Sequence, residues 1–180
     1  MASNTAPQAN PAISIFVDPR DGHRYKTVTI GNLTWMAENL DFGASCNNER
    51  EEKFYSREEV QNAIPSGWRL PTSKDWKQLE QFVVSQGVSK KEIGKALKSR
   101  IEWPCDSKKG SDAFGFCGRP CGRLDEYGAI QDQCKNRIGA WWVNTDKERD
   151  LRVLSDQWTD LLHASSIEGE RYSVRCVKDA

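Results

Sequence analysis

The sequence predicts an α+β fold in which short helices pack on small antiparallel sheets. The clearest helix-capping sequences lie between about residues 56 and 92. Segments with the alternating apolar pattern of strands lie near both ends of the chain, and turns with short strand-like runs follow residue 101. Helices and strands that are grouped along a chain, rather than alternating, are typical of the α+β class.

The chain has 180 residues, which is enough for one domain with a substantial hydrophobic core. Residues 1–17 are predicted to form a disordered linker, because residues 3–12 are small, polar and contain proline. The domain is then expected to span residues 18–180. Residues 1–11 lack the basic start and apolar stretch of a signal peptide, although a removed signal would leave such a start.

Charge and hydropathy argue against two classes of partner. Lys and Arg number 26, and Asp and Glu also number 26. No basic field is therefore expected to attract nucleic acid or an anionic membrane surface. The longest apolar run is far shorter than the roughly 20 residues of a membrane-spanning helix, so no membrane span is expected.

The first strands are predicted to form a tight hairpin. Arg24–Ile30 is rich in Thr and Val, and Leu33–Met36 follows after only Gly31 and Asn32. A two-residue Gly-Asn connection between two strand-like runs is typical of a β-hairpin.

Three helices are predicted from capping boxes, in which Ser or Thr is followed three residues later by an acidic residue. The boxes begin at Ser56, Thr72 and Ser89. The second helix is expected to end near Gly87 and to bury one apolar face, which consists of Trp76, Leu79, Phe82 and Val83.

The later part of the chain is expected to contain short strands and one long loop. The strand-like runs are residues 113–116, 118–124, 129–134, 140–144 and 172–177. Residues 145–171 are charged and weakly patterned, so they are interpreted either as a functional loop or as a tolerated variable insertion.

Several separate segments carry a family resemblance. They are the Arg-Asp-Gly opening at residues 20–22 with Tyr25, Trp-Met-Ala-Glu-Asn-Leu at 35–40, Pro-Ser-Gly-Trp-Arg-Leu-Pro-Thr at 65–72, Gly-Ser-Asp-Ala-Phe-Gly-Phe at 110–116 and Ser-Val-Arg-Cys-Val-Lys-Asp at 173–179. In this order they resemble the Fibrobacter succinogenes major paralogous domain. That resemblance implies a C-type-lectin-like fold with adjacent first and last strands. It also implies a secreted, periplasmic or cell-surface location. The family that it resembles has no established activity.

Six Cys are present, an even number that permits three disulfides. Cys121 and Cys134 lie symmetrically about Tyr127 and Gly128, so a hairpin centred there would place them on facing strands. We therefore expect a Cys121–Cys134 disulfide. Free thiols are the first alternative. Zinc is the second, and it is disfavoured because the Cys spacings lack the Cys-x-x-Cys pairs of structural zinc sites, so no metal site is expected.

The remaining disulfides are less directly indicated. Cys105 and Cys117 are the next expected pair. Relatives usually carry a Cys where this chain has Ile64, and the resemblance implies that it would bridge to the Cys of the final strand. Cys176 thus lacks its usual partner, and Cys46 is expected to replace it.

The predicted ligand-binding residues lie late in the chain. They are Trp141, Trp142, Asn144, Asp146 and Trp158. Adjacent strand residues face opposite sides, so one of the two neighbouring Trp is expected in the core and the other outside, where it could stack on a sugar or be covered by the following loop. Trp158 lies in a polar stretch and is expected to be partly exposed. Calcium-dependent sugar binding is disfavoured, because the usual acidic motif centred on proline is missing, and no cofactor is expected.

The expected function is non-catalytic recognition of a glycan or a surface protein, by a monomer. No nucleophile elbow, phosphate-binding Gly loop or His-x-x-x-His helix is present. Residues 70–76 are similar to a helix start in the formylglycine-generating enzymes, but the Cys pair that those enzymes carry before the last strand is missing. An oxidoreductase of that type acting through Cys117 and Cys121 remains an alternative. A purely structural module of a surface protein is another.

Overall fold

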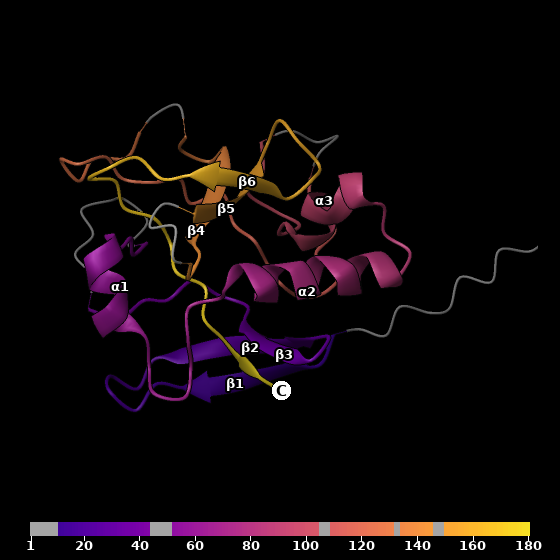
Figure 1. The fold of residues 1–180 in the computed structure, drawn as a ribbon, viewed down its shortest axis with the longest axis horizontal. Coiled ribbons are helices and arrows are strands. Elements are labelled where there is room, and N and C mark those ends of the chain that lie inside the picture. The colour runs from indigo at the N-terminus through magenta and orange to yellow at the C-terminus, as the bar shows by residue number, and fades with distance from the viewer. Residues whose placement is uncertain (1–10, 44–51, 105–108, 132–133, 146–149) are drawn as a thin grey trace, which may run out of the picture.

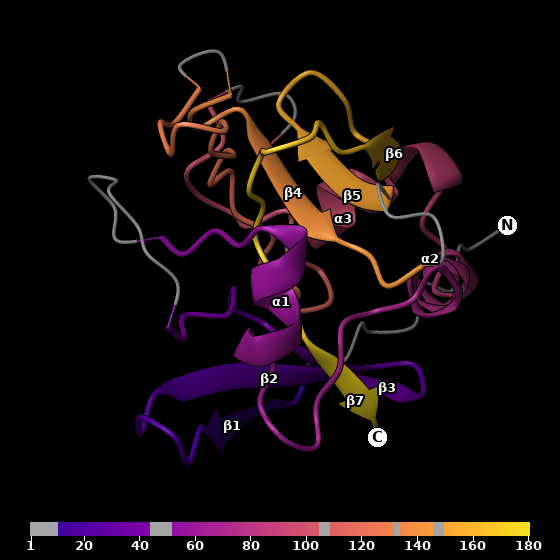
Figure 2. The same cartoon turned by 60° about the vertical axis from the view of Figure 1, so that its left-hand side comes forward.

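A computed structural model describes residues 11–43, 52–104, 109–131, 134–145 and 150–180. These residues form an α+β fold with short helices and two small antiparallel sheets, which lie at opposite ends of the molecule (Figures 1 and 2). The expected α+β class is confirmed. Within the described part of the chain, no helix is long and apolar enough to cross a membrane.

The first sheet has four strands in the order β1-β2-β3-β7. Their bounds are Ile13–Val17 for β1, Arg24–Ile30 for β2, Leu33–Met36 for β3 and Val177–Asp179 for β7. The predicted hairpin is confirmed, with Ile30 opposite Leu33. The terminal strand β7 pairs with β3, as expected.

The expected adjacency of the first and last strands is wrong, because β3 separates the first predicted strand, β2, from β7, and β1 and β7 lie at opposite edges of this sheet. The sequence analysis also placed one strand of this sheet, β1, in the linker. Residues 13–17 pair antiparallel with β2, with Ile15 opposite Lys26. The predicted linker therefore extends too far, and the alternating apolar side chains of residues 13, 15 and 17 were the signal for a strand.

Two of the three capping boxes form as predicted. α1 (Arg57–Ala63) is capped by Ser56 and Glu59, and α2 (Ser73–Ser85) is capped by Thr72 and Asp75. In each box the side chain of the N-cap residue accepts from the backbone N–H of the acidic residue, and the carboxylate of that residue accepts from the backbone N–H of the N-cap residue. Ser89 makes no side-chain cap, and a 3₁₀ turn, η1 (Lys90–Glu92), precedes α3 (Ile93–Leu97).

The second sheet consists of β4 (Ile138–Trp142), β5 (Asp150–Ser155) and β6 (Leu162–Ser165). The stretch 145–171 was expected to be a loop, and β5 and β6 show that this was wrong. β5 is buried on both faces and includes the buried Arg152, so its sequence lacks the simple alternation of a half-exposed strand. The expected strand at residues 113–116 is a turn. Gly118, Gly122 and Leu124 make only isolated β-bridges.

Three hydrophobic clusters fill the interior, and β4 contributes to the two larger ones. In the first, the ring of Trp76 on α2 lies 4.9 Å from Trp35, 5.8 Å from Phe116 and 6.4 Å from Trp141, centroid to centroid. In the second, Trp142 and Tyr172 form an edge-to-face pair at 5.0 Å. The two neighbouring Trp of β4 therefore contribute one side chain to each of these two clusters.

Arg175 joins these clusters through a fully buried guanidinium. Its Nη1 donates to the carbonyl oxygens of Phe116 (2.5 Å) and Met36 (3.2 Å), and its Nη2 donates to Asn39 Oδ1 (2.8 Å). The guanidinium carbon also lies 4.6 Å from the centroid of the Phe116 ring. Within the described residues, no carboxylate forms an ion pair with Arg175.

Gly94 provides a test of the packing between α3 and the chain at residues 159–160. A Cβ at Gly94 would overlap the carbonyl oxygen of Asp160, and the N–H of the next residue, Lys95, donates to Thr159 (2.8 Å). Alanine gains about 1 kcal/mol in helix propensity, but overpacking costs about 1–3 kcal/mol and the hydrogen bond would also be strained. We therefore expect Gly94→Ala to lower the free energy of unfolding, as measured with urea. Lys95→Ala is the control and should change it little. A Gly94→Ala protein as stable as the wild type would contradict this packing.

Candidate functional site

The two tryptophans of β4 are both buried, which corrects the expectation that one of them faces outward. Their side chains alternate as predicted, but each face of β4 is covered. Trp141 lies in the first cluster and donates from Nε1 to Asn39 Oδ1 (2.8 Å). Trp142 is 3% exposed and donates from Nε1 to the carbonyl oxygen of Tyr55 (2.7 Å).

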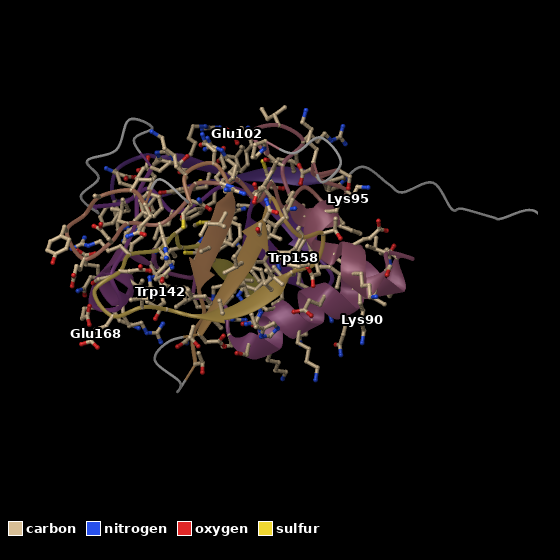
Figure 3. All side chains as sticks on the ribbon, turned by 90° about the horizontal axis from the view of Figure 1, so that it is seen from above. Lys90, Lys95, Glu102, Trp142, Trp158 and Glu168 are labelled. Carbon is tan, nitrogen blue, oxygen red and sulfur yellow. The ribbon has the colours of Figure 1, made fainter. Side chains whose placement is uncertain are left out.

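The other predicted ligand-binding residues are distributed over separate parts of the surface. Trp158 is 59% exposed, as expected, and its carbonyl oxygen accepts from Lys98 Nζ (2.6 Å) near α3. Asn144 is exposed beside the start of α2, where its N–H donates to Pro71 (2.7 Å). Asp146 lies outside the described residues. Figure 3 shows Trp142 and Trp158 well apart, so these two predicted residues do not share one surface.

One pocket does include a predicted residue, and we call it the α1 pocket. It has a volume of about 480 Å³ and lies between the start of α1 and the turn that follows β6. Its lining consists of Ser56, Arg57, Glu58, Trp142, Ser166, Ile167, Glu168, Gly169 and Glu170. Glu168 and Trp142 lie at the same end of the molecule in Figure 3.

Backbone pairing between distant segments creates this pocket. Tyr55 and Tyr172 exchange two hydrogen bonds (2.9 and 3.1 Å), which places the start of α1 beside residues 166–170. The turn is held by the N–H of Ile167, which donates to the hydroxyl of Tyr172 (3.2 Å). Gly169 has φ +80° and lies against Glu126, a position that suits glycine only. Sequence reasoning missed the pocket because it depends on this long-range pairing.

The polar groups of the α1 pocket are held in place. Glu58 accepts from Ser56 Oγ (2.8 Å), and this bond lowers the pKa of its carboxyl. Arg57 Nη1 donates to the carbonyl oxygen of Val143 (3.1 Å). The buried Glu170 accepts from the Tyr172 hydroxyl and pairs with Arg123 (3.1 Å). The pocket therefore offers fixed carboxylate acceptors and one guanidinium donor.

A second pocket contains one residue of the enzyme alternative, and we call it the Cys117 pocket. It measures about 520 Å³, and its lining includes Lys26, residues 37–41, residues 99 and 101–102, Cys117 and Arg119. Cys117 is half-buried, and its N–H donates to Asp112 Oδ1 (2.8 Å). Arg119 pairs with Glu102 through two bonds of 2.8 Å.

The thiols near this pocket lack the environment of an activated nucleophile. Burial raises the pKa of Cys117, and burial raises the pKa of Cys121 to about 12. Asn39 Nδ2 lies 3.4 Å from the sulfur of Cys121 as a donor. Reactive cysteines usually have a lowered pKa, so both thiols fit a structural role better than a catalytic one. In the part of the chain that the structure describes, no three His, Cys, Asp or Glu side chains converge to hold a metal ion.

The expected disulfides are not formed. Cys117, Cys121, Cys134 and Cys176 are free thiols, whereas Cys105 and Cys46 lie outside the described residues. The hairpin that was expected to align Cys121 with Cys134 is shorter than predicted. Its paired residues are Leu124 and Ile130, and the N–H of Gly122 already donates to Ile138 (2.8 Å). The chain thus leaves the hairpin before the two cysteines can face each other.

Thiol labelling tests this arrangement. We expect iodoacetamide at mildly alkaline pH to alkylate Cys117 faster than Cys121, Cys134 or Cys176 in the folded protein, because Cys117 alone of these four is half-exposed. Burial raises the pKa values of Cys117, Cys121 and Cys176 and leaves little thiolate, so these three should react more slowly than in urea. Peptide mass mapping gives the rates. Rapid native alkylation of Cys121 or Cys176, or a disulfide between any of the four, would contradict it.

Comparison with known proteins identifies the family. A family model described as the Fibrobacter succinogenes major domain matches residues 43–178, from before α1 into β7. Neither curated proteins nor solved structures gave a match. The matched segment covers most of the chain and confirms the resemblance seen in the sequence. This chain belongs to the Fibrobacter succinogenes major domain family.

Proposed function

We propose that this protein is a non-catalytic recognition module of a secreted or cell-surface protein, and that it binds a neutral glycan at the α1 pocket. The lectin-like architecture is part of this proposal. It is supported by the α+β fold with two small antiparallel sheets and by the terminal strand that joins the opening hairpin.

The fixed polar lining of the α1 pocket is the observation that carries the proposal. Glu58 and Glu170 are each held by an internal donor, Ser56 and Tyr172 respectively. Their remaining lone pairs can accept from ligand hydroxyl groups, while Arg57 can donate. Groups that are already ordered lose little conformational entropy on binding, and the volume of about 480 Å³ lies in the usual range for ligand pockets.

Charge and burial narrow the ligand class. The lining carries three carboxylates, on Glu58, Glu168 and Glu170, and one guanidinium, on Arg57. Even with Arg123 paired to Glu170, acidic groups outnumber basic ones, so an anionic glycan is disfavoured. Trp142 is too buried to offer its ring face to a sugar. Recognition would therefore depend on hydrogen bonds rather than on the stacking that the sequence suggested. Affinity for a single site should be weak, because each net hydrogen bond contributes only about 1 kcal/mol.

The thiol environments support a non-catalytic role. The alternative oxidoreductase requires a reactive cysteine at Cys117 or Cys121, and burial raises the pKa of both. A protein that binds no ligand at all would instead be a structural module, and the binding experiment below separates that case.

Binding to neutral and acidic polysaccharides and to basic peptides, with calcium and with a chelator, tests the proposal. We expect a neutral glycan to bind without calcium. Glu58→Gln and Glu168→Gln should each weaken binding about threefold to tenfold, which corresponds to one hydrogen bond. Glu92→Gln, on the exposed side of η1, is the matched control and should bind like the wild type.

Trp158→Ala distinguishes the α1 pocket from the surface expected from sequence. Trp158 is remote from this pocket, so its removal should leave glycan binding unchanged. Loss of binding in Trp158→Ala with full binding in the Glu58 and Glu168 variants would place the site elsewhere. Preference for an acidic glycan or a basic peptide, or no binding at all, would also contradict the proposal.

A further inference from the structure

β1 leaves one edge of the four-stranded sheet unpaired. Its five residues pair with β2 on one side, and the described residues supply no backbone partner on the other side. Such an edge presents free N–H and C=O groups that can pair with another strand.

The same strand carries a row of exposed apolar side chains. Ile13, Ile15 and Val17 are 58%, 48% and 45% exposed, and their spacing of two places them on one face of the strand. β1 contains no charged residue, and its sequence is Ile-Ser-Ile-Phe-Val. It therefore lacks the edge lysine, proline or bulge that usually prevents strand association.

Other edges of the sheets are protected. Val177 at the start of β7 exchanges two hydrogen bonds of 2.9 Å with Arg69, and β7 then exposes Lys178 and Asp179. The edge strand β6 exposes the polar or small side chains of residues 163–165. The free apolar edge of β1 thus stands out among the described strands.

We propose that β1 pairs antiparallel with β1 of a second copy of this chain, about a two-fold axis at Ile15. This register places Ile13 opposite Val17 of the other copy and Ile15 opposite its own equivalent. All three exposed positions then form cross-strand pairs of β-branched residues, which favour antiparallel pairing. The symmetry consumes both free edges, so the assembly closes as a dimer and does not extend.

Charge and size are compatible with this partner. Lys26 lies opposite Ile15 and Arg24 lies opposite Val17, so β2 carries positive charge beside β1. In the dimer the two β2 strands would be three strand spacings apart, about 14 Å. That separation exceeds the Debye length of about 8 Å at physiological ionic strength, so their repulsion is screened.

The contact is short, since a five-residue strand spans only about 17 Å. It should bury less than the roughly 1,200 Å² of standard stable interfaces. The dimer is therefore weak and reversible, in contrast to the monomer expected from sequence. Each dimer would carry two α1 pockets, although the pairing itself does not depend on what those pockets bind.

Sedimentation velocity across low micromolar to millimolar concentrations tests the proposal. The wild type should show a concentration-dependent shift from monomer to dimer. Ile15→Lys places two lysines face to face at the axis and should raise the dissociation constant at least tenfold. The matched control Ile101→Lys changes another exposed isoleucine, 71% exposed and outside β1, and should dimerise like the wild type. Circular dichroism and thermal melting would verify that both variants fold.

A charge-swap experiment addresses the register. Ile15→Glu alone should also raise the dissociation constant at least tenfold, but a mixture of the Ile15→Lys and Ile15→Glu proteins should form a mixed dimer, because unlike charges then meet at the axis. A wild type that stays monomeric at all tested concentrations would overturn the proposal. This holds even if a different protein pairs with this edge. A dimer that Ile15→Lys leaves intact, or a mixture that fails to associate, would overturn it as well.

Discussion

The buried guanidinium of Arg175 is the interaction on which the rest of this structure depends. Burying a cation without a carboxylate partner is costly, because the charge loses its hydration. Here the cost is offset by carbonyl oxygens of Met36 and Phe116, by the amide oxygen of Asn39 and by the faces of two aromatic rings. Burial lowers the pKa of Arg175 to about 10, which still leaves the group charged at neutral pH.

This one side chain connects the ends of the domain with both pockets. Its partner Asn39 lines the Cys117 pocket and also accepts from Trp141 on β4. The residue after Trp141 on β4, Trp142, forms part of the wall of the α1 pocket. Arg175 also orders the segment that leads into β7, which completes the four-stranded sheet. The buried charge of Arg175 therefore has its hydrogen-bond acceptors only when segments from the beginning, middle and end of the chain assemble around it.

The parts of the fold that depend on local sequence were predictable. The Gly31-Asn32 connection and the boxes at Ser56 and Thr72 define their elements through contacts within four residues, and each forms as expected. The capping pattern at Ser89 was not sufficient: Ser89 makes no side-chain cap, and the N–H of Lys95 in α3 bonds instead to the distant Thr159.

The candidate site was less predictable, because coverage by distant segments decides it. Alternation along β4 correctly placed Trp141 and Trp142 on opposite faces, but it could not show that both faces are covered. Symmetry about Tyr127 and Gly128 suggested a disulfide, but it could not show that Gly122 pairs with another segment. Only the predicted exposure of Trp158 needed no knowledge of a distant partner.

Urea unfolding of Arg175→Met at neutral pH, compared with wild type, tests the central role of this guanidinium most directly. Methionine is also long and flexible but cannot donate, so the carbonyl oxygens of Met36 and Phe116 and the Asn39 amide oxygen would lose their bonds to this side chain. An unsatisfied buried polar group costs about 1–3 kcal/mol, so we predict a loss of about 3 kcal/mol or more in the free energy of unfolding. Arg24→Met, at an exposed position on β2, should change it little. Because apolar replacement of buried charges is neutral or stabilising in some proteins, an Arg175→Met protein as stable as the wild type would contradict this account.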